Sequence, residues 1–216
     1  MNSTTNEAPR RRPGRPEKPI TRGELLAVAR ACFADGGFDG VSMADIAGRA
    51  GLQKSSLFHH FSTKNELYRA VMQEVFGEIT ERIVEQIDAE GEFLARFDAL
   101  SVALVRFFGD TPTSAKLLLR ELMQPDAIVR EAADALDTVV MGAVALLEEG
   151  MSSGVIPRQD TRHLVATLAA FHVTYFATPM VGDRLFEGGI FSRENIEQRA
   201  LAVRTHSRRL VGAPVS

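Results

Sequence analysis

The sequence of 216 residues contains one cysteine, no tryptophan and no long apolar segment. The single cysteine, Cys32, cannot form a disulfide within the chain, which favours an intracellular, cytoplasmic compartment. No apolar run approaches the ~18 residues of a membrane-spanning helix, and the polar, basic N-terminus lacks the apolar core of a secretory signal. We therefore expect a protein that does not associate with a membrane.

Motifs for catalysis or cofactor binding are also missing. The sequence has no Gly-rich phosphate loop, no H-E-x-x-H and no Cys/His spacing typical of a metal site. His59 and His60 are adjacent, so they project in different directions from a helix, and His163 and His172 are not one helical turn apart. We expect no enzymatic activity, no metal and no cofactor.

Charge is unevenly distributed along the chain. The net charge is −3, but residues 1–67 carry ten Lys/Arg against seven Asp/Glu, which leaves the remainder at −6. A basic N-terminal end on an acidic body is typical of a localised phosphate-binding surface. The acidic remainder would keep non-specific association with nucleic acid weak.

The stretch from Ser42 to Lys64, SMADIAGRAGLQKSSLFHHFSTK, has the pattern of a helix-turn-helix. Ser42, followed three residues later by Asp45, forms a capping box at the start of a first helix. Gly51 supplies the left-handed residue that a tight exit from a helix needs. A second short helix is then expected over residues 53–61.

The outer face of that second helix is polar and cationic, with aromatic side chains between the polar ones. It carries Lys54, Ser55, Ser56, Phe58, His59 and His60. Such a face suits a helix that lies in the major groove of DNA. Helix pairs of this kind also occur in helical proteins that bind no DNA, so the pair alone leaves both interpretations open.

The rest of the chain also has helical periodicity and no alternating strand pattern. Capping boxes at Thr21 and Thr63 predict a helix to about residue 35 and a long helix from 64 to about 88. Apolar spacing predicts five further helices, over residues 93–108, 117–123, 127–149, 160–178 and 194–211. Residues 179–189 contain one Pro and three Gly and predict a loop.

We therefore expect an all-α protein in three parts: a disordered basic arm (1–18), a three-helix helix-turn-helix domain (19–66) and a larger helical ligand-binding and dimerisation domain (67–216). The segment 160–178 is apolar on nearly all sides and cannot face water. We expect it to pack, with residues 194–211, against a second copy in an isologous four-helix interface.

The basic arm contains the sequence RRPGRP, which is similar to the minor-groove motif called an AT-hook, although Pro13 stands where that motif has Arg. Arginine gains from the concentrated negative potential of a narrow A·T-rich minor groove. Arg12 and Arg15 are therefore candidate DNA contacts. The alternative is a basic tail that only makes the chain more soluble.

Two dense motifs connect the chain to a known family. The spacing F-x-x-x-G-F-x-G-x-S-x-x-x-I-A-x-x-A-G runs from Phe33 to Gly51, and L-F-H-H-F-x-x-K runs from Leu57 to Lys64. Residues from about 20 to 70 thereby resemble the N-terminal domain of TetR-type transcriptional regulators. The resemblance implies a homodimeric, ligand-responsive DNA-binding regulator, usually a repressor, whose two-fold symmetry requires a palindromic operator.

The resemblance also assigns roles by position. It implies base or phosphate contacts for Gln53, Lys54, Ser55, Ser56, His59 and His60. Phe58 and Lys64 stand where the family has a phosphate-contacting Tyr and Lys, and Ser42 is a further candidate phosphate contact. Phe58 lacks the hydroxyl of Tyr, and Gln53 and Ser55 replace a common Ser and Gly. Because Gln can pair bidentately with adenine, the operator sequence is expected to differ.

A small-molecule effector is expected in the C-terminal domain. The candidate lining residues are Phe108, Arg120, Met123, Met141, Phe171, His172, Tyr175 and Phe176. Such a lining predicts a mainly apolar ligand, acidic or aromatic in character, with Arg120 as the partner of an anion. Ordinary core packing is the alternative for each of these residues.

Two other function classes are compatible with parts of this pattern. One is a helical ligand-binding or catalytic protein whose basic N-terminus is incidental. The other is an architectural DNA protein that ignores sequence, which the acidic body disfavours. Titration against specific and random duplexes separates the three classes, because no binding indicates the first alternative and equal binding the second.

Overall fold

The computed structural model describes residues 20–123 and 133–215. Within these residues the chain forms ten α-helices and no strand, so the all-α prediction is confirmed. In chain order they are α1 (Arg22–Gly36), α2 (Met43–Arg49), α3 (Lys54–His60), α4 (Lys64–Asp88), α5 (Phe93–Asp110), α6 (Pro112–Met123), α7 (Ala133–Ser152), α8 (Thr161–Ala177), α9 (Pro179–Leu185) and α10 (Arg193–Leu210).

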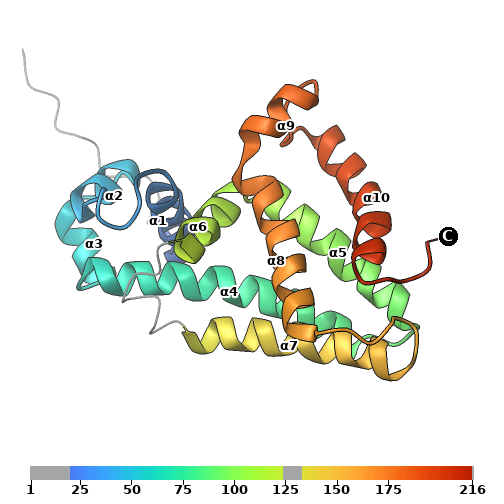
Figure 1. The fold of residues 1–216 in the computed structure, drawn as a ribbon. Helices are drawn as coiled ribbons and strands as arrows, with labels where there is room; N and C mark the ends of the chain where they lie inside the picture. The colour runs from blue at the N-terminus through green and yellow to red at the C-terminus, as the bar shows by residue number, and fades with distance from the viewer. Residues whose placement is uncertain (1–19, 124–132, 216) are drawn as a thin grey trace, which may run out of the picture.

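Helices α1–α3 form a small head, and α5–α10 form a larger body (Figure 1). α4 begins in the head and continues along the body, so that one helix belongs to both. α1 packs against α4 and α6, which gives the head a second contact with the body.

Capping boxes begin the first two helices, as the sequence predicts. The Ser42 hydroxyl accepts a hydrogen bond from the Asp45 N–H at 3.2 Å, and the Asp45 carboxylate accepts one from the Ser42 N–H at 2.9 Å. Thr21 and Glu24 make the same reciprocal pair at the start of α1. Each box satisfies two backbone donors that a helix start would leave without partners.

The third expected capping box is only half formed. The Thr63 hydroxyl accepts from the Glu66 N–H at 3.1 Å, as predicted. The Glu66 carboxylate, however, accepts from the backbone N–H and the hydroxyl of Ser62, at 2.8 and 2.7 Å. The prediction of a complete box at Thr63 was therefore wrong, because Ser62 offers the carboxylate two donors instead of one.

The long helix α4 buries a stripe of apolar residues at every fourth position, as its sequence predicts. The stripe comprises Leu67, Val71, Val75, Ile79 and Ile83, each no more than 7% exposed. The helix has 25 residues and is therefore ~37 Å long at 1.5 Å per residue. It is long enough for its first turns to complete the head and for the rest to line the body.

Aromatic rings fill the core of the head. Phe33 of α1 and Tyr68 of α4 are fully buried, with their rings edge-on at a centroid distance of 4.8 Å. Phe38, from the turn after α1, lies edge-on to Tyr68 at 5.1 Å. Leu57 is also fully buried and attaches α3 to this core.

Two segments differ from the helix boundaries that the sequence predicts. Residues 179–185 form the short helix α9 rather than a loop, and α6 starts at Pro112, five residues before the expected position. Both helices begin with proline, whose restricted φ suits the first helical position and whose missing N–H costs nothing there. The expected helix over 127–149 begins outside the described residues, and its observed part, α7, extends to Ser152.

The substitution Leu57→Ala tests whether α3 depends on its single fully buried side chain. We expect the free energy of unfolding, measured in urea, to fall by about 2–5 kcal/mol because a buried cavity replaces the isobutyl group. Lys54→Ala on the exposed side of α3 is the matched control, and we expect it to change stability by no more than ~0.5 kcal/mol. Equal effects of the two variants would contradict this description of α3.

Candidate nucleic-acid interface and interior cavity

Helix α3 presents its polar face to solvent and its apolar face to the head. Gln53, Lys54, Ser55, His59 and His60 are exposed, and Ser56 is half-buried. Gln53 occupies the N-cap position without making a side-chain capping bond, so its amide remains available to a partner. The residues that sequence analysis assigns to a groove-facing helix thus lie together on one accessible surface, the α3 face.

The α3 face also includes one exposed aromatic side chain, Phe58. Phe58 is 40% exposed, and the Lys54 ammonium lies 5.7 Å from the centre of its ring. A cation over an aromatic ring is weakly attracted by the ring face, by ~0.5–1 kcal/mol at exposed sites. Phe58 therefore helps to hold the Lys54 charge in front of α3. It has no hydroxyl and cannot make the hydrogen bond to phosphate that a Tyr at this position would make.

Two of the predicted phosphate contacts are already engaged within the head. The Lys64 ammonium donates to the carbonyls of Phe38 and Val41, at 2.8 and 3.1 Å. An ammonium has three donors, so one N–H remains for a phosphate. Ser42 uses both its hydroxyl and its backbone N–H to bond Asp45. Arg12 and Arg15 lie outside the described residues.

The body contains a cavity of about 410 Å³ that is partly open to solvent and is walled by α4, α5, α6, α7 and α8. Its lining is mostly aliphatic and aromatic, with Ser101, Glu121 and His172 as polar members among the described residues. Phe76, Ile79 and Ile83 of α4 form one wall. A cavity of this size and character fits a small, largely apolar molecule.

The lining differs from the set that sequence analysis proposes. Phe108 and His172 line the cavity. Met123 and Met141 are 73% and 63% exposed instead. Phe171, Tyr175 and Phe176 lie on α8 outside the lining, where the first two pack on the guanidinium of Arg199.

Arg120, the expected anion partner, also lies outside the lining. A Cβ added at Gly37, in the turn after α1, would be 2.6 Å from Nη1 of Arg120. The guanidinium therefore occupies the space that this glycine leaves open, at the contact between head and body. The α4 wall of the cavity was not predicted from the sequence, although Phe76, Ile79 and Ile83 follow the 3–4 residue spacing of a single helix face.

Burial beside the cavity changes the titration of His172. The side chain is 6% exposed, and its Nδ1 has no hydrogen-bond partner among the described residues. Burial, with a smaller contribution from the charge of Arg199, lowers the pKa of His172 to about 3. The imidazole is therefore neutral at physiological pH, because both effects disfavour its charged form.

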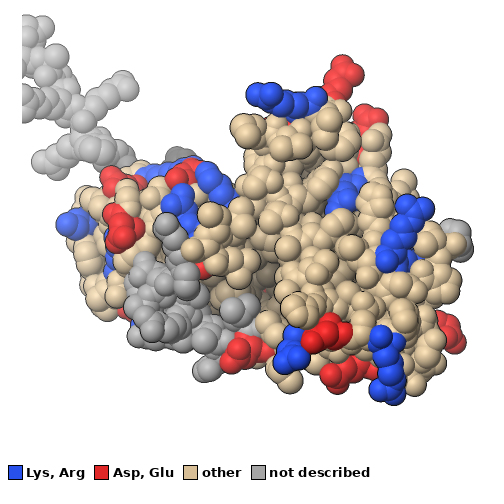
Figure 2. All heavy atoms as spheres, in the orientation of Figure 1, with Lys and Arg blue, Asp and Glu red and all other residues tan. Residues whose placement is uncertain are grey.

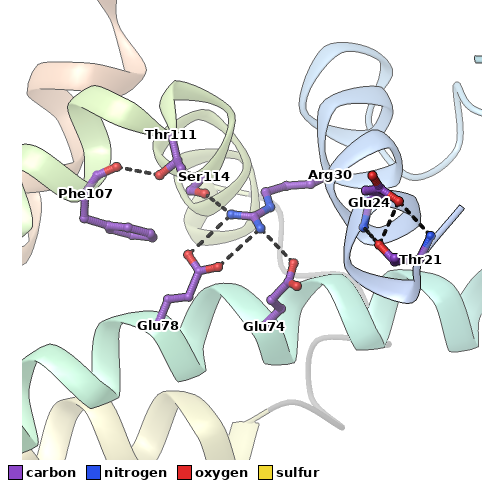
Figure 3. A network of polar contacts seen from close by, with 8 residues as sticks. All are labelled: Thr21, Glu24, Arg30, Glu74, Glu78, Phe107, Thr111 and Ser114. Carbon is purple, nitrogen blue, oxygen red and sulfur yellow. Dashed lines mark hydrogen bonds and ion pairs between the residues drawn. The ribbon is translucent and has the colours of Figure 1, made fainter. Parts of the chain in front are cut away.

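A buried arginine connects the head to two walls of the cavity. Arg30 of α1 donates to Ser114 of α6 at 2.9 Å and to Glu74 and Glu78 of α4, at 2.7 and 3.3 Å (Figure 3). Figure 3 shows its guanidinium between the three helices, pointing away from the α1 backbone. We call these four residues the Arg30 junction.

Both partner helices of the Arg30 junction also reach the cavity. On α4, Phe76 lies between Glu74 and Glu78 in sequence and lines the cavity. On α6, Leu118 lines the cavity one helical turn beyond Ser114. A displacement of either wall would therefore move the groups that hold α1.

The described residues contain no group of three or more His, Cys, Asp or Glu that could hold a metal ion. None of their helices is alone long and apolar enough to span a bilayer, and the α8–α9 pair, bent by 68°, meets that criterion by length and composition only.

The head matches a known family. The family model described as "Bacterial regulatory proteins, tetR family" matches residues 25–71. The transcriptional activator FasR of Mycolicibacterium smegmatis is 46% identical over 63 residues, 29% of each chain. The transcriptional repressor KstR2 of Mycobacterium tuberculosis is 33% identical over 87 residues, 37% of this chain and 44% of its own. The chain thus matches less than half the length of these relatives.

Solved structures share the whole fold at low sequence identity. PfmR of Thermus thermophilus, a TetR-family regulator, has a TM-score of 0.71 at 16% identity and covers 92% of this chain and 100% of its own. FadR of Bacillus subtilis, a transcriptional regulator in complex with stearoyl-CoA, has a TM-score of 0.70 at 17% identity and covers 90% and 100%. These likenesses extend the agreement in architecture from the head to the body.

A double-mutant cycle with Arg30→Gln and Ser114→Ala tests the Arg30 junction. We expect a coupling energy of about 1.5–3 kcal/mol in urea unfolding, because the hydrogen bond is buried and its donor is charged. The exposed pair Arg106 and Glu197, 3.0 Å apart, is the control, for which we expect ~1 kcal/mol or less. A junction coupling no larger than the control would show that α1 is not held to α6 through Arg30.

Proposed function

Because the chain belongs to the TetR family of bacterial regulatory proteins, we propose that it is a homodimeric transcriptional repressor that binds a palindromic operator and is released by a small, mainly apolar ligand. The observation that carries this proposal is the α3 face, where Gln53, Lys54, Ser55 and His59 are exposed together while Leu57 is fully buried. A helix displayed in this way suits the major groove.

The α3 face supports a division of roles between base reading and phosphate binding. Gln53 and His59 carry donors and acceptors suited to base edges, and Gln pairs bidentately with adenine. Lys54 and the remaining N–H of Lys64 are cations or donors suited to phosphates. Phe58 contributes apolar contact and holds Lys54 in position.

A homodimer that forms through α8 and α10 would present two α3 faces, one to each half-site of the operator. Ala166 and Ala170 of α8 are exposed, and so is Leu201 of α10, at 70%. Figure 2 shows that the face of the body around α8 is largely uncharged, with acidic and basic side chains towards its edges. Small, uncharged residues allow helices from two copies to pack closely. Such a dimer would read half-sites ~34–36 Å apart, one turn of B-DNA, or a multiple of that distance.

The shared walls of the cavity support release by a ligand. A ligand that moves α4 or α6 would act on Glu74, Glu78 or Ser114, and through Arg30 on α1. A coupling free energy of ~1–3 kcal/mol would change operator affinity about 5- to 150-fold. FadR of Bacillus subtilis, which has this fold, is in complex with stearoyl-CoA. The stearoyl chain of that ligand is apolar, and this supports an effector with an apolar chain here.

Selection from a random duplex pool tests the DNA-binding half of the proposal. Enrichment of a palindromic sequence is expected. Binding without enrichment would instead indicate an architectural protein, because phosphate contacts alone do not read sequence. Absence of binding would favour a ligand-binding or catalytic protein without specific DNA binding.

Three substitutions test the division of roles on the enriched operator. We expect Lys54→Ala or Lys64→Ala to weaken binding to every duplex and to lower the salt slope by about one ion. We expect His59→Ala to relax discrimination at one base position by about 1–3 kcal/mol and to leave the slope unchanged. The measurement is binding anisotropy across a salt series. A Lys64→Ala variant with an unchanged slope would remove Lys64 from the phosphate contacts and leave it a structural role.

Sedimentation of a Leu201→Asp variant tests the proposed interface. We expect the variant to be monomeric at concentrations where the native chain is dimeric, because a carboxylate facing its symmetry mate would be buried without a partner. Val84→Asp is the matched control, since Val84 is 43% exposed on α4, outside the proposed interface. Dissociation of both variants, or of neither, would contradict an interface through α10.

A further inference from the structure

His172 is a buried lining residue of the cavity, and its imidazole has no hydrogen-bond partner among the described residues. The side chain is 6% exposed and lines the cavity from α8. Its Nδ1 has no partner among the described residues, and no hydrogen bond of its ring is found within them. A buried polar atom without a partner costs about 1–3 kcal/mol. A ligand atom that bonds the ring would give His172 a polar partner that the described residues do not supply.

The state of the ring defines which ligand groups suit it. The neutral imidazole offers one donor and one acceptor, one at each ring nitrogen. A hydroxyl group can bond either nitrogen, and a carbonyl oxygen can accept from the protonated one. Because burial keeps the ring uncharged, it does not supply the positive charge that would hold a carboxylate or phosphate.

The surrounding lining makes an ionic ligand group unfavourable. Phe97, Leu100, Leu104 and Val173 are among the apolar side chains that complete the lining with the α4 wall. The one ionisable side chain besides His172 among the described lining residues is Glu121, itself an acid. Removing a ligand carboxylate from water into such surroundings costs several kcal/mol unless a cation compensates it. The guanidinium of Arg120 lies at Gly37 instead. The guanidinium of Arg199, whose charge acts on His172, lies outside the lining and packs on the rings of Phe171 and Tyr175.

We propose that the cavity binds an uncharged, predominantly apolar molecule whose hydroxyl or carbonyl oxygen hydrogen-bonds to His172. This inference rests on the proposed function, because it identifies the chemical class of the effector that releases the regulator from its operator. It replaces the acidic ligand that Arg120 suggested from sequence. Arg120 instead belongs with Lys116, which pairs with Asp35 at 3.1 Å, at the contact between α6 and the end of α1.

Calorimetric titration of the full chain, without DNA, tests the ligand class. Decanol and decanoate are the probes, because they share an apolar chain and differ in the charge of the terminal group. We expect decanol to bind at least about tenfold more tightly, which corresponds to ~1.4 kcal/mol. Equal or tighter binding of decanoate overturns the proposal, and so does the absence of decanol binding.

Variants of His172 test its contact with the ligand. We expect His172→Phe to reduce decanol affinity about 3- to 10-fold, as the loss of one neutral hydrogen bond predicts. His172→Gln keeps a donor and an acceptor, and we expect it to retain most of the affinity. His163→Phe is the matched control, since His163 is exposed on α8 and outside the lining, and we expect native affinity.

The outcomes separate this proposal from the proposed function. Native decanol affinity in His172→Phe, or equal losses in His172→Phe and His163→Phe, overturns the role of His172. If His172→Phe does not fold, loss of affinity in His172→Gln overturns it and retention supports it. Failure of these titrations leaves operator binding, which is measured separately, unaffected. If operator selection fails, the ligand class that the titrations determine is unaffected.

Discussion

The packing of α4 into two cores at once is the constraint on which the other features of the molecule depend. Leu67 and Val71 are fully buried near its start, and Ile79 and Ile83 are buried further along, where they also line the cavity. A helix is stiff over this length because each turn is hydrogen-bonded to the next. The position of the head therefore follows the position of the cavity wall, and no separate hinge is needed to connect them.

The polar contacts at the same place restrict how the head can move. Buried ion pairs contribute little net stability, because desolvation of the charges offsets their attraction. Their geometry is nevertheless demanding, since Arg30 must meet Glu74, Glu78 and Ser114 together. A shift of α6 relative to α4 would break at least one of these bonds. The Arg30 junction thus favours one arrangement of three helices over neighbouring arrangements of similar apolar packing.

Sequence alone predicted the features that depend on neighbouring residues. The capping boxes at Thr21 and Ser42, the left-handed Gly51 and the four-residue stripe of α4 all depend on chemistry within one or two helical turns. The exposed α3 face followed from the same periodicity. The helix at Pro179 was missed because the three glycines of residues 179–189 suggested a loop. Only one of them, Gly182, lies within the helix, and proline occupies its first position.

The cavity lining could not be predicted in the same way, because it depends on how distant helices cross. Aromatic composition favoured Phe171 and Tyr175, but in the structure their rings pack on Arg199 instead. The role of Arg120 depended on a glycine more than eighty residues earlier in the chain. Lys64 was identified by its place in a motif, yet its bonds to the carbonyls of Phe38 and Val41 required the folded turn.

The ring of Tyr68 has a consequence for exchanging modules between regulators. It is fully buried and lies edge-on to Phe33 and Phe38, although it belongs to the second turn of α4. A chimera joined at residue 66 would lose Tyr68 from the aromatic core of the donor's head. The side chain at the same position of the recipient's helix would take its place. A chimera that keeps the donor's operator specificity must therefore include the first two turns of α4. The segment to be transferred is longer than the helix-turn-helix alone.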